Sequence, residues 1–312
     1  MGNIEEIKNL VQEKAELEAR LNLMPYDGSP EVKENRSGKY LYIRKRVGGR
    51  LTSKYVDVYS DDLYQLLLRN AKEAREIRKS IRRIDKKLAE VGYFREDLNE
   101  KVVLNLDLAR ANLKTSIYDQ AVLEGVSTTF PQTEDIIENG TVNGMTASDV
   151  QKILNLKHAW EFILDEDVIQ VESDYYLLSH IAKLVNEGFY SDGGRIRGVP
   201  VSIGRSTYIP PIPIESVVKE NIKNIYDSDK KDIDKAIELC LYCMKTQVFI
   251  DGNKRASVIF ANHFLISKGL GLLIVPEKHV SEFKKLLINY YEGDKISNIR
   301  KFLKDNCWIK LK

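Results

Sequence analysis

The feature that most constrains this chain is the stretch 246–266, TQVFIDGNKRASVIFANHFLI, in which a polar turn leads directly into an apolar segment. Asp251-Gly252-Asn253 is a turn tripeptide, because glycine accepts dihedral angles that other residues avoid and Asp and Asn side chains bond their own backbone. The residues that follow are apolar over most of a helix surface, which predicts a buried helix beginning near Asn253. We therefore expect this helix to be central in the fold.

The start of the predicted helix has the chemistry of an anion site. The first N–H groups of a helix have no partner within the helix, and the positive end of its dipole lies there. Lys254 and Arg255 add two cations at the same point. Phosphate is the simplest ligand for such a site.

Residues 249–255, Phe-Ile-Asp-Gly-Asn-Lys-Arg, resemble the signature loop of Fic proteins, which is written HPFx(D/E)GN(G/K)R. Members of that family move AMP, phosphate or related groups from a nucleotide to a hydroxyl. The chain departs from the motif where Gln247 replaces the catalytic His and Val248 the following Pro. Lys254 stands where AMP-transferring members usually have Gly, as in the phosphate-transferring Doc branch. Val258 takes the place of a second Arg.

The segment 193–211, GGRIRGVPVSIGRSTYIPP, extends the resemblance. The alternation of Val199, Val201 and Ile203 before Gly204 predicts an exposed β-hairpin, closed by a proline pair that prevents further pairing. It resembles the flap hairpin of Fic proteins, which holds the modified segment as an added strand. The resemblance therefore implies a protein substrate, or the chain itself, bound at this flap.

An upstream segment resembles the inhibitory helix motif of the family, (S/T)xxxE(G/N). Gln120 takes the Ser/Thr position and Glu124 that of the inhibitory carboxylate. In the family this Glu pairs with the second loop Arg and displaces the γ-phosphate of the nucleotide. Because Val258 replaces that Arg, three alternatives stand: Glu124 reaches Arg255, it reaches Lys254, or it only ends a helix.

The resemblance implies a site for ATP or a related nucleotide that uses Mg²⁺. Asp251 would hold the Mg²⁺, since hard cations prefer oxygen ligands. Gly252, Asn253 and Lys254 would offer backbone N–H groups to the phosphates. Arg255 would add a forked contact to phosphate oxygens.

Gln247 is the departure that bears most on catalysis. A positioned base contributes about 10²- to 10⁴-fold to such a transfer, and a glutamine amide takes up no proton near neutral pH. Positioning of the nucleophile is the role left to it. The prediction is a Fic-type protein adenylyltransferase or phosphotransferase with weakened or lost activity. The alternative is a non-catalytic binding or regulatory module, associated with nucleic acid or with a toxin–antitoxin pair.

The first hundred residues differ in character, and we predict that 1–100 is an interaction region and 101–312 a Fic domain. The elements expected in the first part are a helix over 4–22, a loop over 24–38, a β-hairpin over about 40–58 and a long helix over 61–91. The long helix carries a heptad pattern of apolar residues, typical of a helix pair within one chain or between two copies. A homodimer is therefore one interpretation of this region.

The predicted hairpin and long helix are strongly basic. Residues 39–87 contain 15 basic and 6 acidic side chains. One interpretation is a surface for nucleic acid or an acidic partner, with Tyr40, Tyr42 and Tyr55 as stacking groups. The other is a solvated helix face beside a small sheet.

The second part of the chain is predicted to be mainly α-helical. The expected helices cover 102–120, 147–165, 174–188, 214–225, 230–245, 253–268, 276–292 and 296–305. His263 lies within the central helix and is expected to be a packing residue. With no apolar run of about 18 residues, no apolar leader and three cysteines, the sequence predicts a reduced, cytoplasmic protein without a membrane segment, bacterial in style.

Overall fold

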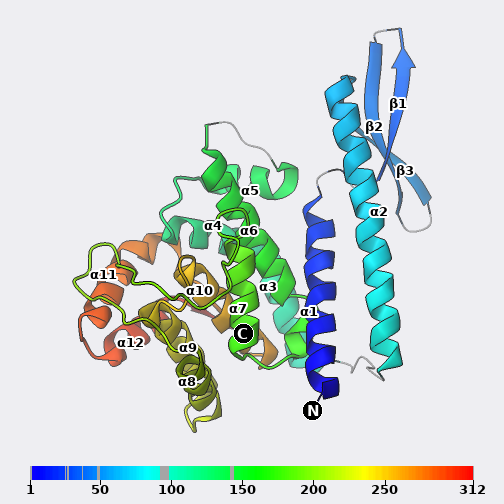
Figure 1. Cartoon of the computed structure of the whole chain (residues 1–312). Coiled ribbons are helices and arrows are strands. Elements are labelled where there is room, and N and C mark those ends of the chain that lie inside the picture. The colour runs from blue at the N-terminus through cyan, green and yellow to red at the C-terminus, as the bar shows by residue number, and fades with distance from the viewer. Residues whose placement is uncertain are drawn as a thin grey trace. The chain divides into compact units, whose positions relative to one another are not determined.

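The structure is a computed structural model that describes residues 2–24, 26, 28–36, 38–47, 50–91, 98–140 and 144–311. It divides into two compact units, Met1–Arg95 and Glu96–Lys312, which are described here one by one (Figure 1). The fold is mainly α-helical, as predicted. The turn predicted at Gly48 and Gly49 lies outside the described residues.

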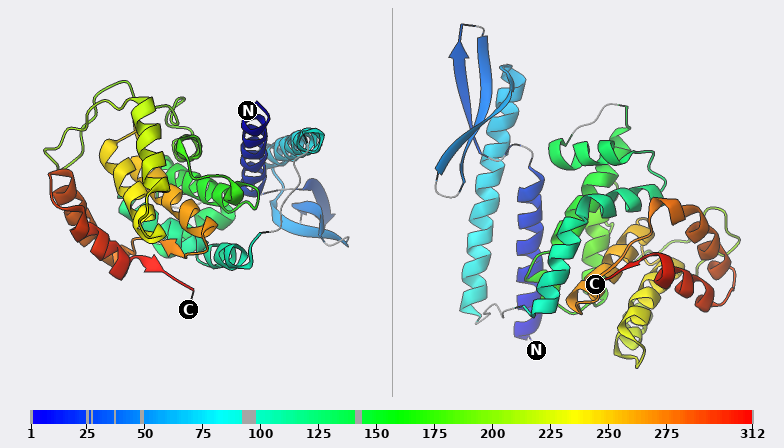
Figure 2. Two further views of the ribbon diagram at one scale, coloured as in Figure 1. Left: turned by 90° about the horizontal axis from the view of Figure 1, so that it is seen from below. Right: turned by 180° about the vertical axis from the view of Figure 1, so that it is seen from behind.

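The first unit combines two helices with one antiparallel sheet. Its elements are α1 (Gly2–Leu23), β1 (Ser29–Asn35), β2 (Gly38–Val47), β3 (Arg50–Val58) and α2 (Asp61–Glu90). The sheet has the order β1-β2-β3. Helix α2 begins after Ser60, whose hydroxyl accepts the Leu63 N–H at 3.3 Å. Helices α1 and α2 lie side by side, so the heptad residues pair within one chain (Figures 1 and 2).

The predicted hairpin is confirmed by the antiparallel pair β2 and β3, but the loop predicted before it was wrong in part, because Ser29–Asn35 forms β1. Val32 of β1 pairs with Leu41 of β2. Leu41 and Ile43 are buried against Leu67 of α2, which gives the sheet its core. A third strand and a helix supply the support that two strands alone lack.

The three tyrosines predicted as stacking groups do gather on this sheet. Since side chains alternate along a strand, Tyr40 and Tyr42 point away from the face that Leu41 and Ile43 turn toward α2. The Tyr42 and Tyr55 rings lie 5.6 Å apart in an edge-to-face arrangement. These rings therefore lie on the sheet face opposite α2.

The second unit contains ten α-helices in the described residues. They are α3 (Glu100–Ala111), α4 (Leu113–Leu123), α5 (Phe130–Asn139), α6 (Ala147–Ile163), α7 (Tyr175–Val185), α8 (Glu215–Asp227), α9 (Asp232–Thr246), α10 (Asn253–Ser267), α11 (Val280–Tyr291) and α12 (Ile296–Asn306). Two 3₁₀ turns, η1 (Val168–Gln170) and η2 (Glu277–His279), and two short strands, β4 (Leu272–Leu273) and β5 (Trp308–Ile309), complete it. Helix α10 lies in the centre, packed by α3, α6, α7 and α9 (Figures 1 and 2).

Two helix predictions in this unit needed correction. The segment predicted as one helix over 102–120 is broken at Asn112, whose side-chain amide donates to the Leu108 carbonyl at 2.8 Å. Helix α5 was missed, although Thr129 opens it with a capping box and Gly140 ends it at a positive φ of 73°. Both signals are local and were present in the sequence.

The flap segment 196–213 forms no paired strands, so the predicted hairpin ladder was wrong. The chain does reverse at Gly204–Arg205, where the Ser206 N–H donates to the Ile203 carbonyl at 3.2 Å. The limbs bond elsewhere: Glu292 accepts the Thr207 N–H at 2.8 Å. The proline pair has no N–H to donate to a facing limb.

His263 is a packing residue in the middle of α10. Its Nε2 donates to the Val168 carbonyl at 2.9 Å, because a carbonyl oxygen can only accept. Its Nδ1 therefore accepts the Ser173 hydroxyl at 2.8 Å. Burial lowers the pKa of His263 to about 4, so the ring is neutral in the folded protein.

This histidine should make the folding free energy depend on pH. In the unfolded chain it titrates near 6.5, so between pH 6.5 and 4 the unfolded state binds a proton that the folded state does not. At pH 5 the folded state should lose about 2 kcal/mol through this group. Urea unfolding at pH 7 and pH 5 measures the loss.

The matched variant is His263→Gln, which has no ionisable ring. Its loss of stability between pH 7 and pH 5 should be smaller than that of the natural chain by about 2 kcal/mol. Equal losses in the two proteins would show that His263 is not held neutral by the fold.

Candidate functional site

The loop 247–252 joins α9 to α10 and is closed by the side chain of Asn253. The Asn253 Oδ1 accepts the Phe249 N–H at 2.9 Å, and its Nδ2 donates to the Phe249 carbonyl at 2.8 Å. The same Nδ2 donates to the Gln247 Oε1 at 3.1 Å. Phe249 is buried below the loop. One asparagine at the helix start thus sets the shape of the whole turn.

Gln247 ends α9 in a left-handed conformation, with φ 49° and ψ 62°. Few residues other than glycine adopt this region. Its backbone N–H donates to the Cys243 carbonyl at 3.2 Å, and its side-chain Nε2 donates to the Met244 carbonyl at 2.6 Å. Both ends of the side-chain amide therefore bond to residues that flank the loop, the Nε2 to Met244 of α9 and the Oε1 to Asn253 of α10, and Gln247 offers no proton acceptor of the strength of an imidazole.

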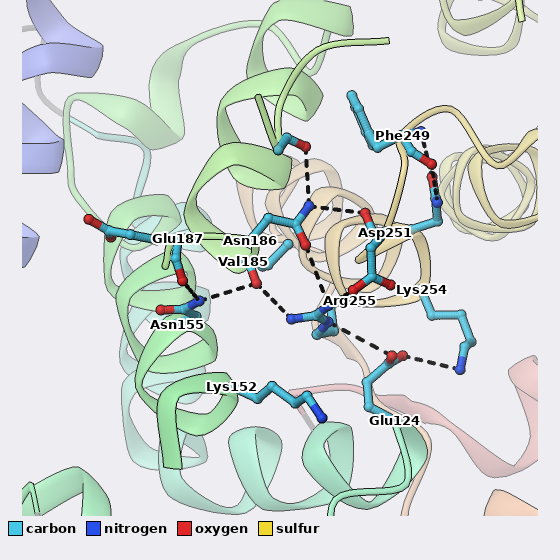
Figure 3. A network of polar contacts seen from close by, with 12 residues as sticks. Glu124, Lys152, Asn155, Val185, Asn186, Glu187, Phe249, Asp251, Lys254 and Arg255 are labelled. Atoms are coloured by element: carbon cyan, nitrogen blue, oxygen red, sulfur yellow. Dashed lines mark hydrogen bonds and ion pairs between the residues drawn. The ribbon is translucent and has the colours of Figure 1, made fainter. Parts of the chain in front are cut away.

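Arg255 lies beneath the loop and is almost fully buried. Its NH1 donates to the Val185 carbonyl at 2.6 Å, and its NH2 donates to the Asp251 carboxylate at 3.1 Å (Figure 3). Its Nε has no hydrogen-bond partner within the described part of the chain. This geometry differs from the forked phosphate contact expected for Arg255, because two of its three nitrogens already bind protein oxygens.

Asn186, at the end of α7, ties the loop down from the other side. Its Nδ2 donates to the carbonyls of Asp251 at 3.0 Å and Gly193 at 3.1 Å (Figure 3). Gly252 has a φ of 72°, and a Cβ built on it would lie 2.7 Å from the Asn186 Oδ1. Only glycine fits here, both for its backbone angle and for this close approach.

A cleft of about 450 Å³ opens beside the loop, at the amino end of α10. It is lined by Glu124, Ser202, Ile203, Gly204, Arg205, Gln247, Asp251, Gly252, Asn253, Lys254, Lys284, Leu287, Ile288 and Tyr291. Three cations and two carboxylates line it. Burial, and then the nearby Lys254, lower the pKa of Lys284. The cations that line this cleft outnumber its carboxylates, which favours an anionic ligand.

Glu124 lies on the wall of the cleft, at the end of α4. Its Oε1 is 3.4 Å from the Lys254 Nζ, and its Oε2 is 3.8 Å from the Arg255 Nε (Figure 3). Its carboxylate is therefore shared between both of the cations that the sequence left as alternative partners.

Gln120 has a structural role. Its Nε2 donates to the Arg255 carbonyl at 2.8 Å, and its Oε1 accepts the Trp160 indole N–H at 2.8 Å. The amide is buried and fully paired. It fixes α4, and with it Glu124, against the first turn of α10.

Arg197 joins the flap to the loop. Its guanidinium donates to five backbone carbonyls: those of Gln247 at 2.5 Å, Val199 at 2.7 Å, Pro211 at 2.6 Å, Pro210 at 3.3 Å and Thr246 at 3.4 Å. The Arg197 N–H also donates to the Val248 carbonyl at 3.0 Å. Burial lowers the pKa of Arg197, and none of the described carboxylates forms an ion pair with it. The Arg197 guanidinium thus holds both ends of the flap to the loop, through hydrogen bonds to main-chain oxygens of each.

Most of the residues that the sequence singled out meet at this cleft. Those that line it are Gln247, Asp251, Gly252, Asn253, Lys254, Glu124, Ile203 and Gly204. Arg255 lies behind the loop. Val199 and Val201 do not line it, and Val199 instead borders a separate cavity of about 580 Å³ with Ile250.

Four residues at the site were missed from the sequence: Asn186, Arg197, Arg205 and Lys284. The partners of Arg197 and Asn186 lie up to about 50 and 65 positions away, so no local pattern points to them.

Comparison with known proteins agrees with this geometry. The Fic/DOC family model matches residues 172–265, and the model of a domain of unknown function, DUF6788, matches residues 4–65. The chain is similar to a protein adenylyltransferase Fic of Drosophila willistoni, with 25% identity over 228 residues, 67% of this chain and 44% of that protein. It is also similar to a protein adenylyltransferase fic-1 of Caenorhabditis elegans, with 23% identity over 54% of this chain and 34% of that protein.

The fold is similar to solved structures of the same kind. Fic-1 from C. elegans superposes with a TM-score of 0.52 and 18% identity, covering 78% of this chain and 74% of that one. A Fic domain containing signaling protein from Bacteroides thetaiotaomicron superposes with a TM-score of 0.53 and 15% identity, covering 67% and 86%. The second unit therefore has a Fic-type fold, and residues 172–265 within it match the Fic/DOC family model. It spans less than half of the length of the curated relatives that it matches.

The role of Arg197 predicts a specific effect of Arg197→Lys. A lysine keeps the charge but cannot reach five carbonyls with one ammonium group. We expect amide hydrogen exchange of residues 198–211 and 246–250 to rise at least about tenfold, as hydrogen bonds worth about 1.5–3 kcal/mol are lost. Hydrogen exchange with mass spectrometry measures it.

Arg195→Lys is the control, since Arg195 is exposed and its guanidinium, among the residues that the structure describes, is paired with Asp192. Its exchange pattern should match that of the natural chain. If Arg197→Lys leaves both segments as protected as before, Arg197 does not hold the flap to the loop.

Proposed function

We propose that this chain binds the phosphates of ATP or a related nucleotide at the amino end of α10, as a Fic-type protein. In this proposal it transfers AMP or phosphate to a protein hydroxyl, with activity weakened or lost because Gln247 replaces the loop histidine. The observation that carries the proposal is the cleft of about 450 Å³ that opens on this helix end with three cations on its walls. The relatives named as protein adenylyltransferases support the class of reaction.

Phosphate binding rests on the donors at the start of α10. The first intrahelical bond is from the Ala256 N–H to the Gly252 carbonyl at 2.8 Å. The N–H groups of the residues before Ala256 are therefore the unpaired donors of this helix. They lie at the positive end of the dipole, and Lys254 and Lys284 add charge beside them.

The residues present fit a Mg²⁺ ion bound together with phosphate. The Asp251 carboxylate is half exposed on the cleft wall, and only its Oδ2 receives the Arg255 guanidinium. Within the described residues no three His, Cys, Asp or Glu side chains form a metal site. Asp251 would thus be the only protein ligand, with phosphates and water as the others, as Mg²⁺ commonly has in nucleotide sites. The ion would supply positive charge to the phosphates.

A protein target would bind along the flap. The segment from Val199 to Ile203 has no regular secondary structure, and its main chain forms no strand ladder. An added strand could therefore pair with it, with Ile203 and Gly204 bringing the target hydroxyl toward the cleft. Val199, Val201 and Ile203 would give the side-chain contacts.

Glu124 would regulate this site. Its carboxylate contacts the two cations, Lys254 and Arg255, nearest to the expected phosphate position. The negative charge of Glu124 would repel a nucleotide phosphate there and would compete with it for both cations. We therefore propose that Glu124 inhibits nucleotide binding.

A specific observation favours the second candidate, a binding module without transfer. Both ends of the Gln247 amide are bonded to residues that flank the loop, so the residue is used as part of the scaffold. Such a protein would bind nucleotide or a peptide and leave both unchanged. Transfer and binding are therefore measured separately.

The test is Gln247→His with ATP labelled on the adenine or on the γ-phosphate. A histidine is accepted in the left-handed conformation of this position better than most residues are. It would restore a proton acceptor, and label incorporation into protein should rise about 10²- to 10⁴-fold. Autoradiography of the purified chain, alone and with cell extract, measures the incorporation, and the position of the label distinguishes AMP from phosphate transfer.

The control is Gln247→Asn, which also suits the left-handed conformation and supplies no base. It should show the low incorporation of the natural chain. Equal incorporation by the natural chain and Gln247→His would refute the role given to Gln247. If Gln247→His binds nucleotide but incorporates no label, the binding module is the correct function.

A further inference from the structure

The first unit contains a groove that the family of the second unit does not explain. It lies between α2 and the end of the sheet where Ser29, at the start of β1, pairs with Arg44 of β2. Its volume is about 600 Å³. Six basic residues line it: Arg44, Lys45, Arg75, Arg78, Lys79 and Arg82. The other lining residues are small, and none of the residues that line it is acidic. A recess with this composition selects a polyanion.

The cations of the groove lie along one face of α2. Arg75, Arg78, Lys79 and Arg82 follow steps of three and four, so they form one stripe along the helix. Leu67, Ala74, Ile77, Ile84 and Leu88 form the buried face. Ala74 of that face also lines the groove, so the stripe borders the buried face.

Three of the groove cations are available to a ligand. Arg75, Lys79 and Arg82 are exposed, and none of them forms an ion pair with any residue that the structure describes. Two of the three are arginines, whose planar guanidinium groups match phosphate oxygens in pairs. Placing like charges along one stripe costs free energy unless a ligand neutralises them.

The shape of the groove narrows the choice of polyanion. Proteins that bind a nucleic-acid duplex insert a projecting helix or ribbon into one of its grooves. Here the cations line a recess, which admits one sugar–phosphate strand. Single-strand binders use such a positively charged groove to follow the backbone.

We propose that this groove binds the sugar–phosphate backbone of a single-stranded nucleic acid, with Arg75, Lys79 and Arg82 as phosphate contacts. Binding depends on phosphates and is independent of base sequence. The tyrosines of the sheet lie on its other face and are not part of this site. The inference stands apart from the function proposed for the second unit.

The test uses the full chain and a fluorescein-labelled 20-nucleotide single strand of mixed sequence, with fluorescence anisotropy at several salt concentrations. The groove variant is Arg75→Gln, Lys79→Gln and Arg82→Gln together. The control is Arg69→Gln, Arg83→Gln and Lys87→Gln, which removes two arginines and one lysine from exposed positions of α2 outside the groove. Both variants change the net charge equally, and circular dichroism checks that each is folded.

We expect the groove variant to bind at least about tenfold more weakly at 0.1 M salt, and the control to bind within about twofold of the natural chain. Three lost phosphate contacts should also flatten the slope of log K against log salt by about 2. Single-stranded RNA of the same sequence should behave as DNA does, and the duplex should bind more weakly.

Three results would overturn the inference. Equal weakening by the two variants would show that net charge alone attracts the strand. Stronger binding of the duplex would exclude the single-strand assignment. If polyglutamate displaced the strand as effectively as unlabelled oligonucleotide at the same concentration of negative charge, the groove would be assigned to an acidic protein.

Discussion

The site depends first on the buried guanidinium of Arg197. It bonds main-chain oxygens at both ends of the flap and at the start of the loop, and so joins two segments that no strand ladder connects. Hydrogen bonds from a charged donor are worth about 1.5–3 kcal/mol each, more than those between neutral groups. Asn253 and Asn186 add neutral bonds within the loop. The turn before α10 is therefore held by side chains that bind backbone, and it places the first N–H groups of α10 at the helix end that borders the cleft.

The electrostatics of the cleft follow from this anchoring. Arg255 is held beneath the loop by Val185 and Asp251, so its charge reaches the cleft mainly through the Nε that faces Glu124. Lys254 is shared with the same carboxylate. One acidic side chain thus offsets two cations at the helix end, while Lys284 and Arg205 add two further cations to the lining of the cleft. An anion that enters must compete with Glu124 for the first pair.

The parts of this account that the sequence predicted are those set by neighbours in the chain. The turn 251–253 and the buried helix after it needed only a local pattern, and His263 followed from its place in that helix. The flap shows the limit: alternation indicated extended chain, but pairing depends on Glu292 and Arg197, which lie far away in the sequence. Strand β1 was missed for the same reason. Its pairing with β2 defines it as a strand, and its own sequence shows no alternating pattern that would have predicted it. The groove beside α2 was visible only once the sheet had been placed against it, because Arg44 and Lys45 of β2 line it together with residues of the helix.

The central claim is that the amino end of α10 is a phosphate site that Glu124 opposes. Isothermal titration calorimetry with ATP and Mg²⁺ tests it most directly, with the natural chain, Glu124→Gln and Glu282→Gln, an exposed residue of α11 that does not line the cleft. The account predicts that Glu124→Gln binds about tenfold more tightly than the natural chain, a gain of about 1.4 kcal/mol, and that Glu282→Gln is unchanged. Equal affinity of all three proteins, or no binding by any of them, would contradict it.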